Sequence, residues 1–528
     1  MIKVGSINKY IMRYNLFLFL GMFFFILSSC KNPTKEKKVY TQTFEPTWES
    51  LINNEIPEWL KDAKFGIYAH WGVYSVPAFE TEWYGKRMYM IGTPVYEHHV
   101  KTYGDPSVFG YKELIPLFHA ENYNPVDWAD VIKQSGAKYA GFAVVHHDGF
   151  CLWDSKFTRW NSMNMGPKRD LYGDLVKELK KNDLKVIATF HNISTFNWYL
   201  PWIANFHSKP DSVKRKEYAD KKWDIFDPEF GDLYWNDEIG SNKKDFIREW
   251  RNKVTEVIDI YKPDLLWFDG GIYQDESSVS EVQELLCYYY NKQNEWQKPV
   301  VVLNKLAGSM QFNFPKEFGM LTFEEGRDRL ADEPGPWIDD MKISDRAWCY
   351  IEGQNYKTAN EIVDGLVDRV SRGGGLLLNL SPKADGTIPE KQKTILREVG
   401  DWLKINGEAI FETRPWKIHA EGPQDKFLTQ GNHPKWTFTD NCDSGDVRFT
   451  AKDNALYVIA LGWPEDMQLL IRSINNQNTV SSGRIKSVSL LGSSEKVKWS
   501  VEKDGAHIVL PEKINDIALV LKFETTGK

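Results

Sequence analysis

Short apolar segments alternate with amphipathic segments between Lys64 and Leu380. The apolar segments begin at Lys64, Tyr139, Lys185, Asp264, Val300, Met320, Trp348 and Gly375. Amphipathic segments lie between them, at Trp128–Gly136, Leu175–Asn182, Phe246–Tyr261, Val279–Gln293 and Ala359–Val370. This alternation is typical of βα units around a parallel sheet. The number and spacing of the strands predict an α/β fold with a (β/α)8-like barrel, and a doubly wound sheet is the alternative.

The pattern changes after a further helical segment at Lys391–Asn406. Beyond Pro415, short apolar strands are separated by polar turns, and they begin at Trp436, Val447, Ala455, Ser487, His507 and Ile517. Such a series predicts an all-β sandwich of about a hundred residues. We therefore expect a catalytic barrel in residues 46–412 and a C-terminal β-sandwich in residues 413–528.

The first thirty residues have the pattern of an export signal. Basic residues precede an apolar run over residues 16–27, which is too short for a typical membrane-spanning helix. Leu27-Ser28-Ser29-Cys30 follows, as in bacterial lipoprotein signals whose cysteine becomes lipidated. We expect a lipoprotein signal peptide in residues 1–30, lipidation at Cys30 and a solvated tether in residues 31–45. The protein would then be exported and lipid-anchored in a bacterial envelope; an ordinary signal peptide or an uncleaved anchor is the alternative.

Composition narrows the class of protein. The net charge of −7 argues against a nucleic-acid partner, which needs a basic surface. Aromatic residues make up 14% of the chain, with 21 tryptophans, which fits either a large core or a site where rings stack on sugars. The four cysteines beyond Cys30 have no paired spacing of the metal-binding or redox kind, so mostly buried thiols are expected.

Six successive strands of the predicted barrel end in polar or acidic residues. These are His70, His146-His147-Asp148, His191-Asn192, Asp269, Asn304-Lys305 and Glu324-Glu325. Barrel enzymes place their chemistry at the C-terminal ends of the strands. Structural need alone does not explain six such endings in succession, so the pattern favours an active site.

Asp269 and Glu324 are the candidate catalytic carboxyl groups. Asp269 follows four large apolar residues and precedes two glycines, where the backbone can turn and a ligand can approach. A turn aspartate is the alternative. Glu324, two strands later, can face Asp269 across the barrel mouth, whereas Glu325 should point the other way. A salt bridge with Arg327 or Arg329 is the alternative for either glutamate. Carboxyl groups about 5–5.5 Å apart support double displacement, with one group as nucleophile and the other as acid and base.

The histidine pair His146-His147 raises the question of a metal. Adjacent residues on a strand point apart, and no further ligand motif accompanies them, so neither a metal nor a cofactor is expected. Imidazole offers one donor and one acceptor, which suits sugar hydroxyl groups. His70, followed by Trp71, is expected to have the same role, although a buried core histidine is the alternative.

Longer motifs, in order along the whole barrel, resemble glycoside hydrolase family 29, the α-L-fucosidases. They are Ala63–Pro77, Glu82–Tyr84, His146–Ser155, Asn161, Lys168–Leu171, Trp267–Gly270, Ser371–Gly374, Leu377–Asn379, Ala384–Pro389 and Gly407–Ile410. The resemblance implies a retaining exo-hydrolase that releases terminal L-fucose from a fucosylated oligosaccharide or polysaccharide. It makes Asp269 the nucleophile and Glu324, at a position that varies between subgroups of the family, the acid/base. It implies that the substrate is held by His70, Glu82, Trp83, His146 and His147, with Trp267 lining the pocket.

Three positions depart from the family pattern. Asn304-Lys305-Leu306 stands where many members have Asn-Asp-Arg, so Lys305, which we include among the substrate-binding residues, lacks the guanidinium fork. The third strand ends in Phe190-His191-Asn192, and the usual His-His-Glu is His-His-Asp here. These departures affect the expected linkage more than the reaction. A catalytically silent glycan-binding lipoprotein and an enzyme for α-L-galactosides are the rival predictions.

Overall fold

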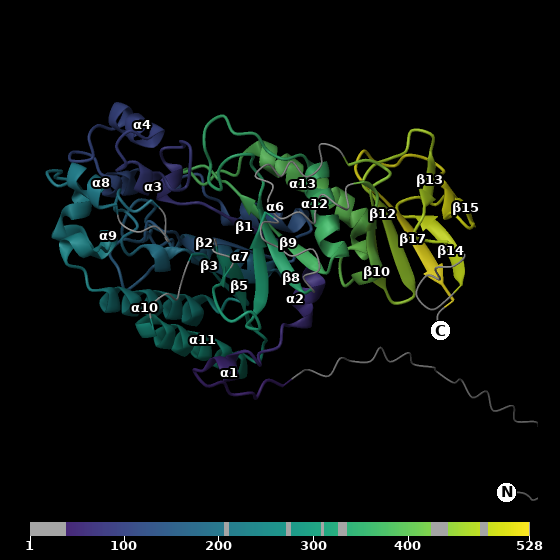
Figure 1. Ribbon diagram of the computed structural model, residues 1–528, viewed down its shortest axis with the longest axis horizontal. Helices are drawn as coiled ribbons and strands as arrows, with labels where there is room; N and C mark the ends of the chain where they lie inside the picture. Colours follow the sequence, from purple (N-terminus) through teal and green to yellow (C-terminus); the bar gives the residue numbers. More distant parts are fainter. Residues whose placement is uncertain are drawn as a thin grey trace, which may run out of the picture. The chain divides into compact units, whose positions relative to one another are not determined.

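The computed structural model describes residues 39–204, 211–270, 276–307, 311–325, 335–423, 442–475 and 484–526. The expected signal peptide, Cys30 and most of the tether lie outside this part of the chain. All helices and strands given below belong to one unit, Tyr40–Lys528 (Figure 1).

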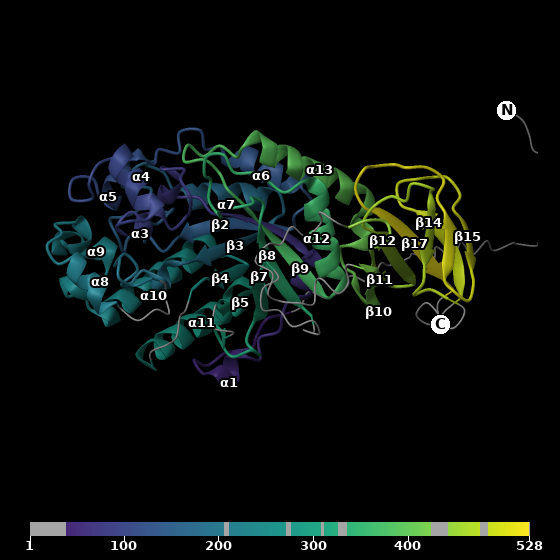
Figure 2. The ribbon, with the colours of Figure 1, turned by 45° about the horizontal axis from the view of Figure 1, so that its top comes forward.

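Eight parallel strands close into a barrel. They are β1 (Phe65–Ala69), β2 (Tyr139–Val145), β3 (Lys185–Phe190), β4 (Leu265–Phe268), β5 (Val301–Ala307), β7 (Met320–Glu324), β8 (Trp337–Lys342) and β9 (Gly374–Leu380). The order is β4-β3-β2-β1-β9-β8-β7-β5, and pairing of β4 with β5 closes the ring (Figure 2). A two-residue strand, β6 (Gln311–Phe312), pairs antiparallel with β5. The predicted (β/α)8-like barrel is confirmed, and the doubly wound alternative is wrong.

Helices connect the strands. The long ones are α6 (Pro125–Gln134), α7 (Leu171–Lys181), α10 (Lys243–Tyr261), α11 (Glu276–Trp296), α12 (Ala359–Ser371) and α13 (Glu390–Asn406). Shorter ones are α1 (Trp48–Leu51), α2 (Glu58–Ala63), α3 (Tyr84–Arg87), α4 (Pro94–Thr102), α5 (Tyr111–Leu114), α8 (Ser212–Glu217) and α9 (Gly231–Tyr234). Local sequence sets where they begin: Thr358 and Glu361 form a capping box at the start of α12. The long helices α10 and α11 pack side by side (Figure 1).

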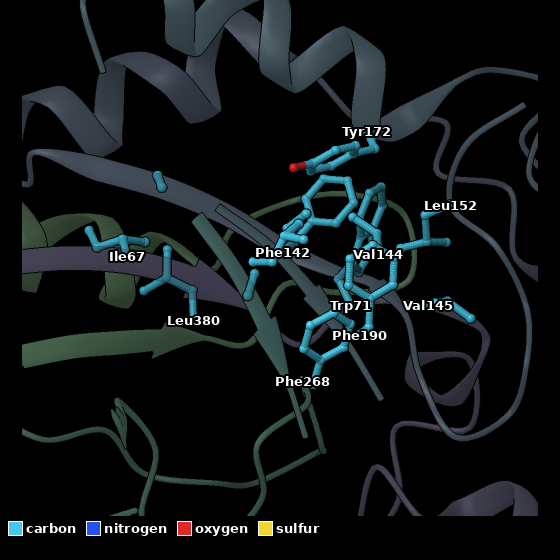
Figure 3. Close-up of a cluster of buried hydrophobic side chains, with 14 of the residues drawn as sticks. Ile67, Trp71, Phe142, Val144, Val145, Leu152, Tyr172, Phe190, Phe268 and Leu380 are labelled. Carbon is cyan, nitrogen blue, oxygen red and sulfur yellow. The ribbon is translucent and has the colours of Figure 1, made fainter. Parts of the chain in front are cut away.

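Alternation along each strand separates two apolar layers. On β4, Leu266 and Phe268 belong to the large cluster between strands and helices, whereas Leu265 and Trp267 belong to the cluster inside the barrel. The outer layer includes Phe190, whose ring stacks on that of Phe268 with centroids 5.6 Å apart (Figure 3). Because successive side chains point to opposite faces, the residue two positions after Trp267 faces the barrel interior. That residue is Asp269.

One predicted strand is wrong. The segment from Trp348 to Glu352 forms no strand, and the seventh barrel strand is β8 instead. Asp339 and Asp340 interrupt the apolar pattern of β8, which is why the pattern does not reveal it. Both aspartates are buried, and each has a partner: Asp339 contacts Arg369 at 2.6 Å, and Asp340 accepts a hydrogen bond from Tyr68.

The C-terminal part forms two antiparallel sheets. One consists of β10 (Arg414–Glu421), β11 (Val447–Lys452), β12 (Ala455–Ala460), β14 (Ile485–Leu490) and β17 (Leu519–Thr525); the other consists of β13 (Gln468–Ile471), β15 (Lys498–Val501) and β16 (Ala506–Val509). Apolar residues of both sheets share one core, so the predicted sandwich is confirmed. The strand expected from Trp436 lies outside the described residues, and the domain limits at 412/413 stay predictions.

Buried charges join the barrel to the sandwich. The side chain of Arg448 on β11 is fully buried and contacts Asp368 of α12 at 2.6 Å. Arg372, which follows α12, contacts the same carboxylate at 3.1 Å. The Trp402 indole N–H also donates to the carbonyl of Ala518 at 2.7 Å. The two parts are therefore held together by specific polar contacts as well as by apolar packing.

The cysteines of the described residues form no disulfide bonds. Cys151, Cys287, Cys349 and Cys442 are free thiols; Cys151 and Cys349 are buried, and the other two are half-buried. Among the described residues, no helix is long and apolar enough to cross a membrane.

Candidate active site

Two carboxyl groups and one ammonium group meet at the C-terminal end of the barrel. The Lys305 Nζ atom lies 2.6 Å from Oδ1 of Asp269 and 2.9 Å from Oε2 of Glu324. Since one nitrogen touches both oxygens, the oxygens are at most about 5.5 Å apart, within the separation used for double displacement. Asp269 and Glu324 are both partly exposed, while Lys305 is buried.

Asp269 is held as a carboxylate. Its Oδ1 also accepts a hydrogen bond from the backbone N–H of Gly270 at 2.9 Å, and its Oδ2 lies 3.5 Å from Nε2 of His191. Burial alone would raise the pKa of Asp269, but Lys305, His191 and His147 outweigh it and lower the pKa below its usual range. The side chain is therefore ionised over the whole working range of a typical enzyme.

Gly270 is required by the local backbone. Its φ angle is +83°, and a Cβ atom at this position would lie 2.2 Å from Oγ of Ser194. Only glycine fits this turn without displacing a neighbour, which explains why glycine directly follows Asp269.

Four histidines follow the first three strands and lie close together. The ring of His70 lies 5.4 Å from that of His146 and 5.0 Å from that of His191, and His146 and His147 are 4.4 Å apart, all between centroids. Burial lowers the pKa of His70 and of His147 to about 4 each. Burial also lowers the pKa of His146 and His191 well below the usual range. The rings are therefore neutral at ordinary pH.

Neutral imidazoles can hold either hydroxyl groups or a metal ion. Ring nitrogens of His70, His146 and His191 lie within 4.8 Å of one another, close enough to bind one divalent ion. Nδ1 of His146 and both ring nitrogens of His191 have no hydrogen-bond partner among the described residues. His70 is oriented by a contact of 2.8 Å between its Nδ1 and Oδ1 of Asn379.

The remaining predicted binding residues lie around the histidines and Lys305. Trp83 packs its ring 5.6 Å from that of His147, and Glu82 accepts a hydrogen bond from the backbone N–H of Trp348 at 3.1 Å. Trp267 lies inside the barrel mouth, with its ring centroid 5.2 Å from Nζ of Lys305. The structure thus brings all nine predicted catalytic and substrate-binding residues to one end of the barrel.

Two glutamates at the end of β7 have different surroundings. Glu324 contacts Lys305, whereas Glu325 forms an ion pair of 2.7 Å with Lys342. The expected alternative partners Arg327 and Arg329 lie outside the described residues. The contacts single out Glu324 as the glutamate beside Asp269.

A buried acid beside the carboxyl pair was not predicted from the sequence. Asp340 of β8 is the register partner of Glu324, and it accepts a hydrogen bond of 2.9 Å from the Tyr68 hydroxyl group of β1. Both are buried. The signal that could have revealed Asp340 was its position next to Asp339, two charged residues within an apolar segment that starts at Trp337. His191 appeared among the strand ends but was not selected as a site residue.

A barrel with a close pair of carboxyl groups at its strand ends defines the class: it is the site of a retaining glycoside hydrolase. Comparisons agree with this class. Residues 32–408 match the family model described as alpha-L-fucosidase, and residues 440–524 match the alpha-L-fucosidase C-terminal domain. The plasma alpha-L-fucosidase of Homo sapiens is 32% identical over 483 residues, which cover 89% of each chain. The chain belongs to the alpha-L-fucosidase family.

Solved structures support the same assignment. The Thermotoga maritima alpha-fucosidase, solved in complex with fucose, is 31% identical, with a TM-score of 0.68 over 91% of this chain and 100% of that one. A Thermotoga maritima alpha-L-fucosynthase, solved with a fucosyl azide disaccharide, is 29% identical with a TM-score of 0.70. The resemblance identified from the motifs is confirmed.

Proposed function

We propose that this protein is a retaining, exo-acting α-L-fucosidase that hydrolyses terminal L-fucose from oligosaccharides or polysaccharides. The observation that carries the proposal is the contact of one ammonium group with both Asp269 and Glu324, because it keeps these carboxyl groups at double-displacement distance. Membership of the alpha-L-fucosidase family, over nearly the whole barrel, supports fucose as the sugar.

The roles of the two carboxyl groups follow from their surroundings. Asp269 is ionised and attacks the anomeric carbon, while Glu324 gives its proton to the leaving oxygen. Glu324 then takes a proton from the water molecule that hydrolyses the glycosyl ester. The geometry supports the nucleophile role of Asp269, whose carboxylate lies beside Lys305, His191 and the Gly270 N–H.

The neutral imidazoles and the aromatic rings bind the sugar. Nδ1 of His70 contacts Oδ1 of Asn379, and Nδ1 of His147 contacts the carbonyl oxygen of His191, so Nε2 of each ring is the atom that can accept from a sugar hydroxyl group. His146 adds a third neutral imidazole. Trp83 and Trp267 supply flat apolar faces for the ring and its methyl group. Glu82, whose pKa is raised by burial, lies at the same edge and is assigned to the substrate-binding set.

Parallel assays with 4-nitrophenyl α-L-fucoside and α-L-galactoside test this function. The two sugars differ only at the 6-position, and we expect the fucoside to have the higher kcat/KM. Preference for the galactoside would favour the related exo-glycosidase. Tight binding of several fucosides without any product would favour the catalytically silent glycan-binding protein. Asp269→Ala serves as the matched inactive control.

We also propose that the protein is exported and held to a bacterial envelope by lipid on Cys30. The support is the order of basic residues, the apolar run over residues 16–27 and Leu27-Ser28-Ser29-Cys30. Metabolic labelling with a fatty-acid analogue in a bacterial host tests this proposal. We expect label on the wild type and none on Cys30→Ala; equal labelling, or release of an unlabelled wild type into the medium, would contradict it.

A further inference from the structure

Lys305 has more carboxyl neighbours than its single charge can neutralise. Asp269 and Glu324 contact its nitrogen directly, and Asp340 is a third acid that acts on it electrostatically. Burial lowers the pKa of Lys305, but these three acids outweigh it and raise the pKa above its usual range. The ammonium group is therefore charged throughout the reaction.

The two steps of the reaction move a negative charge between the two carboxyl groups. In the first step an oxygen of Asp269 bonds to the anomeric carbon, the bond to the leaving oxygen breaks, and the Glu324 proton goes to that oxygen. Asp269 becomes a neutral ester while Glu324 becomes a carboxylate. In the second step water gives a proton to Glu324 and its oxygen bonds to the anomeric carbon, so the bond to Asp269 breaks and Asp269 regains its charge.

The third acid, Asp340, is placed where a charge would interfere. Its side chain is only 1% exposed; Oδ2 accepts from Tyr68 at 2.9 Å, and Oδ1 has no hydrogen-bond partner among the described residues. A carboxylate with one oxygen buried and unpaired is costly. Burial raises the pKa of Asp340 well above its usual range, and Glu324 adds to the effect although Lys305 opposes it.

We propose that Lys305 is a catalytic counter-ion that stabilises Asp269 before the first step and Glu324 after it. Asp340 is then an uncharged positioning residue, which does not compete with Asp269 and Glu324 for the positive charge of Lys305. The inference rests on the proposed function, because it assigns the two steps to these carboxyl groups. It replaces the substrate-binding role that we predicted for Lys305 from the sequence.

The titratable groups around Lys305 and Asp269 come from most of the barrel. They are Tyr68 and His70 from β1, His147 after β2, His191 after β3, Glu324 from β7 and Asp340 from β8. The carboxyl groups of Asp269, Glu324 and Asp340 raise the pKa of Lys305, and Lys305 in turn lowers the pKa of His70, His147 and His191. Lys305 is the largest of the effects that lower the pKa of Asp269, so its loss should raise that pKa.

The first test compares Lys305→Met and Lys305→Arg with the wild type on 4-nitrophenyl α-L-fucoside across pH. We expect Lys305→Met to lower kcat by about 10²–10³-fold. Its acid limb of kcat/KM should move up by roughly one pH unit or more. Lys305→Arg keeps the charge and should keep the wild-type acid limb. A wild type without fucosidase activity would refute the proposed function. An active wild type whose Lys305→Met variant changes only KM would refute this inference alone.

The second test compares Asp340→Asn with Asp340→Ala. Asparagine mimics an uncharged acid, so it should recover most of the kcat lost in Asp340→Ala and keep the wild-type acid limb. A shifted limb, or equal losses in the two variants, would overturn the assignment of Asp340. If both variants fail to fold by circular dichroism, Tyr68→Phe replaces them: an unmoved limb supports the assignment and a moved limb overturns it. Glu325→Gln, beside Glu324 but paired with Lys342, is the matched control.

Discussion

Nε2 of His191 lies 3.5 Å from Oδ2 of Asp269, while Lys305 contacts the other oxygen of the same carboxylate. His191 is buried, and burial lowers its pKa well below the usual range, so this neighbour is a neutral imidazole at ordinary pH. The nucleophile is therefore stabilised by one fixed charge and by dipoles. Protonation of the histidines, which changes the charge around the substrate, is expected only in acid.

Activity should fall on acidification because of imidazoles rather than the nucleophile. The pKa of Asp269 is lowered, and His70 and His147 have pKa values of about 4 each. Below that pH both rings become cations and lose the acceptor that a sugar hydroxyl group needs. We expect the acid limb of kcat/KM near pH 4, steeper than a one-proton limb. His147→Asn should reduce it to one proton. A limb near pH 6.5, where an exposed imidazole titrates, would contradict the account.

Glu324→Gln should slow the release of a poor leaving group most. An aryl fucoside with a leaving group of low pKa needs little proton donation, whereas a fucosylated disaccharide needs it fully. We expect kcat/KM to fall by about 10²–10⁴-fold on the disaccharide and much less on the aryl fucoside. Glu325→Gln is the control and should behave like the wild type. Equal losses of Glu324→Gln on both substrates would show that this residue is not the general acid.

Asp269→Gly should lose hydrolysis and recover a different reaction with azide. Glycine removes the nucleophile and leaves space at the anomeric carbon, so an azide ion can attack from the same side. We expect kcat to fall by about 10³-fold or more without azide. With azide, the product should be the fucosyl azide of the opposite anomer, identified by nuclear magnetic resonance. Hydrolysis at the wild-type rate would remove Asp269 from the mechanism.

The buried charges between barrel and sandwich should matter for stability. Arg448→Met leaves Asp368 with Arg372 alone and removes a fully buried cation from its partner. Breaking such a pair costs about 3–5 kcal/mol, so the midpoint of thermal unfolding should fall by several degrees. Lys404→Met, which breaks an exposed pair with Asp401, is the control and should cost at most about 1 kcal/mol. Equal effects of the two substitutions would show that the Arg448 contacts contribute little.

Most of the barrel could be predicted because its strands are continuous apolar runs. The alternation of side chains also placed Asp269 and Glu324 toward one interior. The seventh strand escaped because Asp339 and Asp340 interrupt its apolar pattern, and their compensation by Arg369 and Tyr68 comes from distant segments. Strands β10, β13 and β15 of the sandwich were missed for a related reason. They are short or largely exposed, so they have little apolar pattern.

For the active site, too, the sequence predicted some features, whereas others depend on segments that only the fold brings together. Motifs identified which residues gather at the strand ends, but not the contacts that they make. Lys305 illustrates this: the sequence suggested a residue that binds sugar, and the structure places it between the two carboxyl groups. Only the fold brings β4, β5 and β7 together in that order.

Trapping the glycosyl-enzyme tests directly whether Asp269 is the nucleophile. The wild type would be incubated with a 2-fluoro-fucosyl fluoride, whose fluorine at carbon 2 slows hydrolysis of the intermediate, and then digested and analysed by mass spectrometry. We expect one added 2-fluorofucosyl group per chain, on the peptide that contains Asp269, and none in Asp269→Gly. A label on Glu324 or another residue, or full turnover without any covalent adduct, would contradict it.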